Sequence, residues 1–194
     1  MLELKDIILS SNTIELPQPL SLTAEAGKVT TVTGPAGSGK TWLLKAIMGL
    51  APHESGYITI NGEVVTPDSA PFFRKHIAYV PQDVTMPPMT ISEIIGQLWT
   101  LHSNSNKEFH HADLRRQWQV LDLDSQLWET TTDNIPAPTL RRMLLSVTPY
   151  LKRPILLVDM PCLDQTAEHQ SRIRTFLQQQ AEGGAIVLIT DRPY

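Results

Sequence analysis

The sequence contains a single cysteine, Cys162, among its 194 residues. One cysteine cannot form an intramolecular disulfide, and no charged-then-apolar secretory leader opens the chain, so we expect a reducing, cytoplasmic compartment. Long hydrophobic runs are also missing, since none approaches the roughly 20 residues that a membrane-spanning helix needs. Any association with the inner (plasma) membrane is therefore expected to be peripheral and to come through a partner protein, without direct insertion.

Basic residues are scarce as well. The 16 lysines and arginines are outnumbered by 20 aspartates and glutamates, the formal net charge is −4, and no basic block appears. A surface that binds nucleic acid needs such a block to neutralise phosphates, so DNA and RNA are not expected partners. Hydrophobic residues at 41% and charged residues at 19% are ordinary for a globular protein, and the length predicts one domain over residues 1–194.

Strand and helix patterns follow one another along the chain. Alternating or β-branched runs predict strands, and apolar residues at every third or fourth position predict helices. The strands are expected at residues 2–9, 20–23, 28–33, 57–62, 76–80, 155–158 and 186–189, and the helices at 41–50, within 90–151 and at 166–181. The first two strands resemble an antiparallel flap, with a turn at Asn12 and residues 17–19. A polar linker is expected at residues 103–107, and a parallel βαβ unit closes the chain.

The segment from Gly34 to Thr41 reads Gly-Pro-Ala-Gly-Ser-Gly-Lys-Thr and fits the pattern Gly-x-x-x-x-Gly-Lys-[Ser/Thr] in full. It follows a predicted strand and precedes a predicted helix, which disfavours the alternative of a chance glycine-rich turn. Gly37 and Gly39 allow positive φ angles, so that successive N–H groups and the helix N-terminus point at a phosphate. Lys40 is expected to reach the β- and γ-phosphates, and the Thr41 hydroxyl is expected to coordinate Mg²⁺.

An acidic residue, Asp159, ends the apolar run at residues 155–158. A carboxylate at the C-terminal end of a buried parallel strand is suited to holding the Mg²⁺ shell beside a phosphate loop. This pattern is common by itself, and it gains its meaning from the loop at residues 34–41. The two motifs together predict ATP and Mg²⁺ as ligands.

The order of these elements resembles the ATP-binding subunits of ATP-binding cassette (ABC) transporters over nearly the whole chain. The resemblance rests on residues 26–50, 55–62, 77–82, 90–95 and 154–164. It implies an α/β P-loop NTPase with a RecA-like core at about residues 1–85 and 152–194, an antiparallel β flap, and a helical subdomain at about 86–151. It also implies that Gln82 senses Mg²⁺ and the γ-phosphate, the alternative being an exposed turn residue. The implied nucleotide-binding residues are Gly34, Pro35, Ala36, Gly37, Ser38, Gly39, Lys40, Thr41, Trp42 and Gln82, and the implied Mg²⁺ ligands are Thr41, Gln82 and Asp159.

Three positions depart from the family's pattern. The catalytic glutamate is replaced by Met160, which cannot accept a proton from water. The switch histidine is replaced by Asp191, whose carboxylate is expected to repel the γ-phosphate. The Leu-Ser-Gly-Gly-Gln signature is replaced by Ile-Pro-Ala-Pro-Thr at residues 135–139, where two prolines remove backbone donors. No aromatic residue near Asn12 is available to stack on adenine, so base selectivity is less defined than phosphate binding.

These departures lead to a first hypothesis of an ATP-binding subunit with weak or no hydrolysis. It would dock on a transmembrane transporter subunit, with a second ATP-binding subunit in a homo- or heterodimer. The alternative is an active ATPase that energises transport and takes its base from Asp164 or from a partner chain. A kinase is disfavoured because no acceptor lid with arginines is seen, and a structural relic is disfavoured because the phosphate loop is complete.

Overall fold

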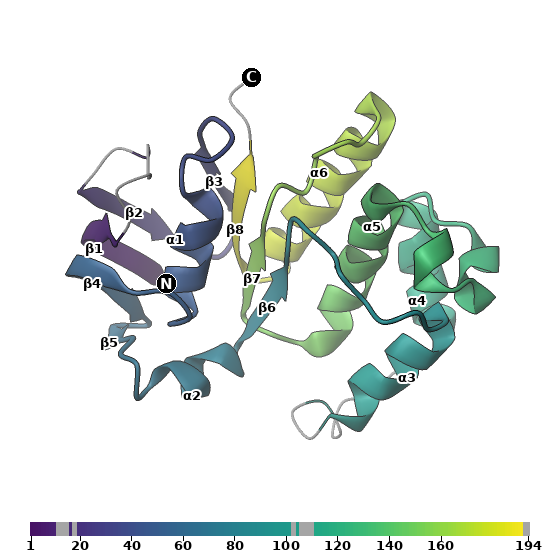
Figure 1. Ribbon diagram of the computed structural model, residues 1–194, viewed down its shortest axis with the longest axis horizontal. Coiled ribbons are helices and arrows are strands. Elements are labelled where there is room, and N and C mark those ends of the chain that lie inside the picture. The colour runs from purple at the N-terminus through teal and green to yellow at the C-terminus, as the bar shows by residue number, and fades with distance from the viewer. Residues whose placement is uncertain (11–15, 17–18, 102–103, 105–110, 192–194) are drawn as a thin grey trace.

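The chain folds into two four-stranded sheets with helices between and beside them (Figure 1). The computed structural model describes residues 1–10, 16, 19–101, 104 and 111–191. The antiparallel sheet, which we call the flap, has the order β2-β1-β4-β5, and the parallel sheet has the order β3-β8-β7-β6. The strands are β1 (Leu2–Leu9), β2 (Leu20–Ala24), β3 (Val29–Thr33), β4 (His53–Ile60), β5 (Glu63–Val64), β6 (Ile77–Val80), β7 (Ile155–Val158) and β8 (Ile186–Asp191).

The helices are all of modest length. Within the part of the chain that the structure describes, no helix is both long and apolar enough to cross a membrane. Short 3₁₀ turns accompany the α-helices between β6 and β7. The helices are α1 (Lys40–Ile47), α2 (Ala70–Arg74), α3 (Ile91–Thr100), α4 (His111–Val120), α5 (Ala137–Val147) and α6 (Ala167–Glu182), and the 3₁₀ turns are η1 (Ser125–Glu129), η2 (Thr132–Asn134) and η3 (Thr148–Leu151).

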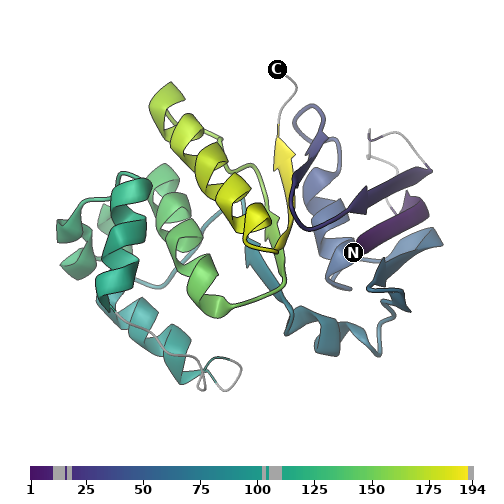
Figure 2. The ribbon, with the colours of Figure 1, turned by 180° about the vertical axis from the view of Figure 1, so that it is seen from behind.

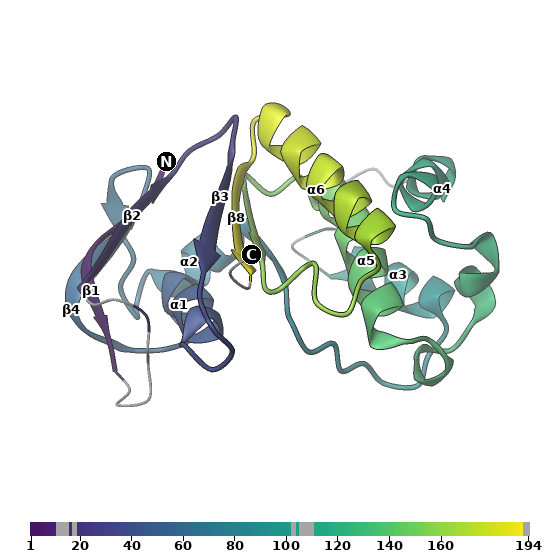
Figure 3. The ribbon, with the colours of Figure 1, turned by 90° about the horizontal axis from the view of Figure 1, so that it is seen from above.

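The parallel sheet is covered on both faces, as seen from behind and from above (Figures 2 and 3). Successive residues of a strand point to opposite faces, so β7 contributes to two hydrophobic clusters. Ile155 and Leu157 pack with the flap and α1, whereas Leu156 and Val158 pack with α5, α6 and the other helices of that side. Burial on both faces explains why the central strands are continuous apolar runs, as the sequence predicts.

The register of the parallel sheet brings four strand ends to one edge. Thr33 lies opposite Asp191, Ile189 opposite Val158, and Val158 opposite Val80. The phosphate loop, Asp159 and Gln82 each follow one of these carboxyl ends. Ligands of open α/β sheets bind at this edge, so the fold brings the predicted site residues together.

Several element boundaries differ from the prediction. Helix α1 ends at Ile47 because Gly49 has a φ of +64°, and a Cβ there would collide with Ala70. Strand β4 begins before the predicted residue 57, because its pairing with β1 reaches back to His53 opposite Leu9. Helix α2 and strand β5 were not predicted, since five and two residues are too few to show a period.

The predicted turn at Asn12 and residues 17–18 lies outside the described residues, as does the linker at 103–107 except for Asn104. That residue is only 3% exposed. Its Nδ2 donates to the Leu98 carbonyl at 2.9 Å, and its Oδ1 accepts from Arg153 at 2.9 Å. The expectation of a surface linker is wrong at Asn104, because an amide bonded at both ends belongs to the packed interior.

Candidate nucleotide-binding site

The phosphate loop connects β3 to α1 and has the predicted backbone geometry. Gly37 and Gly39 have φ angles of +80° and +98°, which residues with a side chain rarely adopt. Gly39 is the N-cap of α1, and the first intrahelical bond runs from the Leu43 N–H to the Gly39 carbonyl at 2.9 Å. The backbone amides of the first turn of α1 therefore stand at a helix N-terminus, where an anion is favoured.

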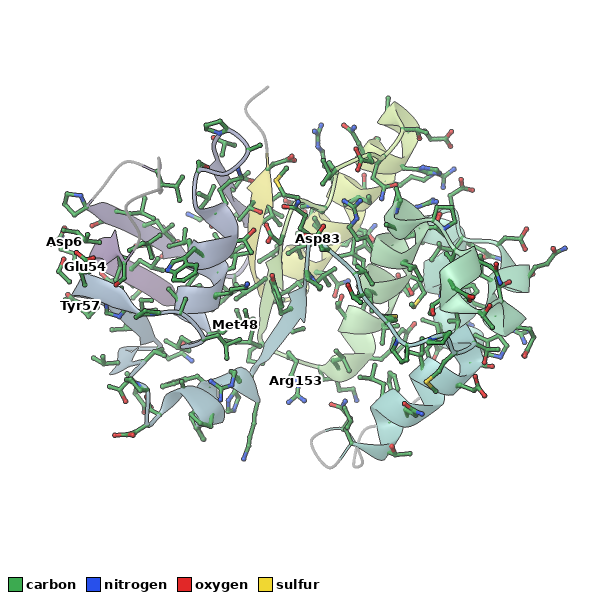
Figure 4. The ribbon with its side chains drawn as sticks, viewed as in Figure 1. Asp6, Met48, Glu54, Tyr57, Asp83 and Arg153 are labelled. Carbon is green, nitrogen blue, oxygen red and sulfur yellow. The ribbon has the colours of Figure 1, made fainter. Side chains whose placement is uncertain are left out.

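A pocket of about 230 Å³ opens at this helix start. Its lining consists of the loop residues 36–41 together with Gln82, Met160 and Leu163. Gln82 leaves the carboxyl end of β6, and the next residue, Asp83, is seen there in Figure 4. The structure thus joins the phosphate loop with the residue that the resemblance assigns to Mg²⁺ and γ-phosphate sensing.

The ammonium group of Lys40 lies against the loop. Lys40 is 5% exposed, and its Nζ donates to the carbonyls of Gly34 and Pro35 at 2.7 Å each and to Ser38 Oγ at 3.3 Å. These three oxygens are uncharged, so they hold the amine in place without cancelling its charge. A fixed cation beside helix amides is suited to binding phosphate oxygens.

Asp159 is fully buried at the end of β7, and hydroxyl groups from two other elements bind its carboxylate. Thr41 Oγ1 donates to Oδ2 at 2.6 Å, and Thr190 Oγ1 donates to Oδ1 at 2.5 Å. The phenol of Tyr79 on β6 faces the same group. Burial raises the pKa of Tyr79 to about 12, and the charge of Asp159 and a hydrogen bond to it add to the increase.

The oxygen donors at this point suit Mg²⁺. The Thr41 hydroxyl and the Asp159 carboxylate are 2.6 Å apart, and Gln82 lines the same pocket. Mg²⁺ prefers a few such oxygens with water and phosphate completing its coordination. The residues present therefore fit the ion that the sequence predicts.

Met160 is the residue at which the resemblance would place a catalytic glutamate. It has a φ of +51°, is 5% exposed, and lines the pocket. Its N–H donates to Thr190 Oγ1 at 3.0 Å, and its carbonyl accepts from Arg141 at 3.4 Å. The residue that follows Asp159 therefore brings a thioether, and no titratable group, to the pocket lining.

The pocket lining does not include every predicted residue, since it lacks Gly34, Pro35, Trp42, Asp159 and Asp191. The Trp42 indole donates to the Pro52 carbonyl at 3.4 Å, away from the pocket. Asp191 lies beside Cys162, where burial raises the pKa of the thiol and the charge of Asp191 adds to the increase. The predicted repulsion of the γ-phosphate by Asp191 stays a prediction, and this placement does not favour it.

The segment aligned with the signature begins α5. Pro136 is the N-cap and Pro138 occupies the first turn, so neither position has an N–H. The Thr139 N–H donates to the Pro136 carbonyl at 2.9 Å. The first four backbone positions of this helix, counted from its N-cap, are residues 136–139. Of these, only Ala137 has an N–H that is left for an external anion.

The sequence did not predict that Leu163 lines the pocket, or that Tyr79 and Thr190 contact Asp159. Thr190 had a visible signal, because it is a polar residue at the carboxyl end of the apolar run 186–189. Tyr79 and Leu163 had none, since their contribution depends on the strand order and on the turn after Asp159.

Comparisons with known proteins agree with this geometry. Residues 17–163 match the ABC transporter family. The chain is 29% identical over 193 residues to the Fe(3+) ions import ATP-binding protein FbpC of Pseudomonas fluorescens, covering 97% of this chain and 53% of the relative. The chain spans between 26% and 53% of the length of the first curated relatives that it matches.

Solved structures share the fold. A putative ABC transporter ATP-binding protein from Pyrococcus furiosus has a TM-score of 0.82 at 21% identity, covering 100% of this chain and 92% of that one. A dimeric ATP-binding cassette in a post-hydrolysis state, bound to ADP and phosphate, has a TM-score of 0.79 at 17% identity, covering 100% and 88%.

The family match extends over most of the chain and includes the phosphate loop, Gln82 and Asp159. The α/β P-loop fold with its flap and the resemblance drawn from the sequence are both confirmed. This chain belongs to the ABC transporter family and has the fold of an ATP-binding cassette.

Proposed function

We propose that this chain binds Mg-ATP with weak or no hydrolysis and couples its nucleotide state to a membrane transporter partner. The observation that carries the proposal is Met160, which lines the pocket directly after Asp159. None of the described residues that line this pocket has a carboxylate. This lining supports a site that holds phosphate but has no side chain of its own to accept a proton from water.

Binding needs only groups that this chain has. The loop amides and Lys40 would hold the phosphates, and Thr41, Asp159 and Gln82 would hold Mg²⁺. A bound Mg²⁺ would neutralise phosphate charge. Lys40, Thr41 and the loop would bind the ground state without accelerating the chemical step, because a hydrolytic rate requires contacts that strengthen in the transition state.

Partners follow from the family. One solved cassette with this fold is dimeric, and one relative, of Haemophilus influenzae, is an ATP-binding/permease protein. We extend this to a homo- or heterodimer of this chain, cytoplasmic and attached to the inner membrane through a transporter subunit. The region of Gln82 and the helices of residues 86–151 would dock on that subunit, with residues 1–85 and 152–194 as the core. A phosphate bound by a partner subunit and facing Pro136 and Pro138 would meet few backbone N–H donors. ATP hydrolysis at the partner's site would therefore also be slow.

The binding part of the proposal is tested by ATP titration of the purified protein. Saturable ATP binding that Lys40→Ala abolishes is expected, and its absence would end the proposal. Trp42→Phe serves as a matched control, because its side chain points away from the pocket and only its N–H is expected to act.

The hydrolysis part is tested by turnover, in the purified protein and in the assembly isolated from its own membrane. A rate well below about one per second is expected. Turnover at or above that rate, lost in Lys40→Ala, would instead indicate an active ATPase. Asp164, the candidate base for that alternative, pairs with Arg141 at 3.7 Å and does not line the pocket.

A further inference from the structure

Thr190 is a buried residue at the end of β8 that touches the two chain positions on which the nucleotide site depends. It is 0% exposed and follows the apolar run at residues 186–189. Its Oγ1 lies 2.5 Å from Asp159 Oδ1 and 3.0 Å from the Met160 amide nitrogen. Thr190 does not line the pocket, so it acts on the site only through these neighbours.

The two hydrogen bonds of Thr190 determine where its proton lies. The Met160 N–H is a donor, so Thr190 Oγ1 accepts there and its own proton is directed to the Asp159 carboxylate. A hydroxyl that donates to a carboxylate at such a short distance makes a charge-assisted hydrogen bond, which is stronger than one between neutral groups. Thr190 therefore restrains Asp159 Oδ1.

The second oxygen of Asp159 has a different partner. Oδ2 accepts from Thr41 at 2.6 Å, and Thr41 is itself an expected Mg²⁺ ligand in the pocket. If the Thr41 hydroxyl oxygen bound a metal ion, the hydrogen bond from Thr41 to Asp159 would change. The hydrogen bond from Thr190 on β8 could remain. Thr190 is thus a contact from β8 that orients Asp159 in both situations, beside the Tyr79 phenol on β6.

We propose that Thr190 is a positioning residue that holds Asp159 Oδ2 toward Mg²⁺ and the Met160 backbone in its turn. The inference rests on the proposed function, because it assumes that Mg-ATP binds at Asp159. Partners that orient a metal ligand typically change metal affinity by roughly 10- to 100-fold when they are removed. The same hydroxyl holds the positive φ of Met160, which places that side chain in the pocket.

The test compares the affinity for ATP in Mg²⁺ and in EDTA, measured by calorimetry on the full chain. The ratio of the two dissociation constants is the gain that Mg²⁺ provides. Thr190→Val keeps the shape and removes the hydroxyl, and it is expected to lower this gain roughly 10-fold or more while affinity in EDTA stays within about twofold. Thr190→Ser restores a hydroxyl and is expected to restore the gain.

Thr148→Val is the matched control, because Thr148 is also buried and donates to the Leu145 carbonyl at 2.8 Å, away from the pocket. Its Mg²⁺ gain is expected to equal that of the wild type. In an Asp159→Asn background, Thr190→Val is expected to have no further effect on the gain, because the ligand that it orients is already lost.

An unchanged Mg²⁺ gain in Thr190→Val would overturn the inference, as would equal losses in Mg²⁺ and in EDTA with the circular dichroism of the folded protein intact. Thr190→Ala removes the same hydroxyl and takes the place of Thr190→Val if that variant does not fold. Failure of the proposed function would look different, because the wild type itself would then bind no ATP in either condition.

Discussion

The variant Asp164→Asn is expected to destabilise the fold more than Arg141→Met, although both break the same ion pair. Arg141 on α5 is only 3% exposed at its side chain, whereas the side chain of Asp164 is 69% exposed, and their charged atoms are 3.7 Å apart. Burial lowers the pKa of the Arg141 guanidinium, and the charges of Asp164 and Asp83 partly offset this decrease. Its Nε has no hydrogen-bond partner among the described residues.

The magnitudes follow from which charge is left behind. Methionine at 141 removes a costly buried cation and keeps an apolar chain of similar length, so we expect a free energy of unfolding within about 1 kcal/mol of the wild type. Asparagine at 164 leaves the cation buried without its nearest carboxylate. Removing one partner of a fully buried pair costs roughly 3–5 kcal/mol; because Asp164 itself is exposed, we expect about 1–2 kcal/mol.

The measurement is urea and thermal unfolding followed by circular dichroism. For a chain of this size 1 kcal/mol corresponds to roughly 2–4 °C, so Asp164→Asn is expected to lower Tm by about 2–8 °C. Glu168→Gln is the control, because Glu168 pairs with Arg172 at 2.9 Å on the exposed side of α6 and is expected to change stability by less than about 0.5 kcal/mol. A loss above about 2 kcal/mol in Arg141→Met, with Asp164→Asn unchanged, would refute the reasoning.

Three further predictions concern other parts of the molecule. Gly56→Ala is expected to cost more than about 3 kcal/mol in urea unfolding, because Gly56 has a φ of +80° and a Cβ would collide with the Lys5 carbonyl in β1. Phe176→Ala is expected to cost about 3–5 kcal/mol in the same measurement, since Phe176 is fully buried between α6 and the parallel sheet; a loss below about 1 kcal/mol would contradict this. Tyr79→Phe is expected to flatten the loss of stability in alkali, measured as unfolding free energy against pH. The folded pKa of about 12 lies above the unfolded value of 10.0, so the neutral phenol's contribution is fully present below pH 10 and is lost as the pH rises from 10 toward 12. An equal decline in both proteins would exclude Tyr79 as its source.

Local sequence was sufficient where the structure depends on neighbouring residues. The phosphate loop was predictable because glycines, a lysine and a helix start act within eight positions, and the positive φ angles of Gly37 and Gly39 agree. The capping box of α3, in which Thr90 and Glu93 bond each other's backbone amides, is a local signal of the same kind.

Non-local pairing was not predictable in the same way. The sequence placed a strand near residue 57, but its partner β1 and its start at His53 depend on contacts about 45 residues apart. The bond from Thr190 to Asp159 requires β8 to lie beside β7, which no local pattern specifies. The side of the sheet to which Asp191 points follows from the same pairing, and a two-residue period alone cannot choose it.

The order of strands β3-β8-β7-β6 also affects how the protein forms during synthesis. Among the strands of the described residues, β8 comes last in sequence, yet it lies in the interior of the parallel sheet between β3 and β7. As a ribosome releases the chain, the flap can form before the parallel sheet is complete, because β1, β2 and β4 precede β6, β7 and β8. The phosphate loop leaves the ribosome soon after, but the hydroxyl of Thr190 arrives about 150 residues later. A newly made chain can therefore hold a complete glycine loop well before it can hold the carboxylate opposite that loop.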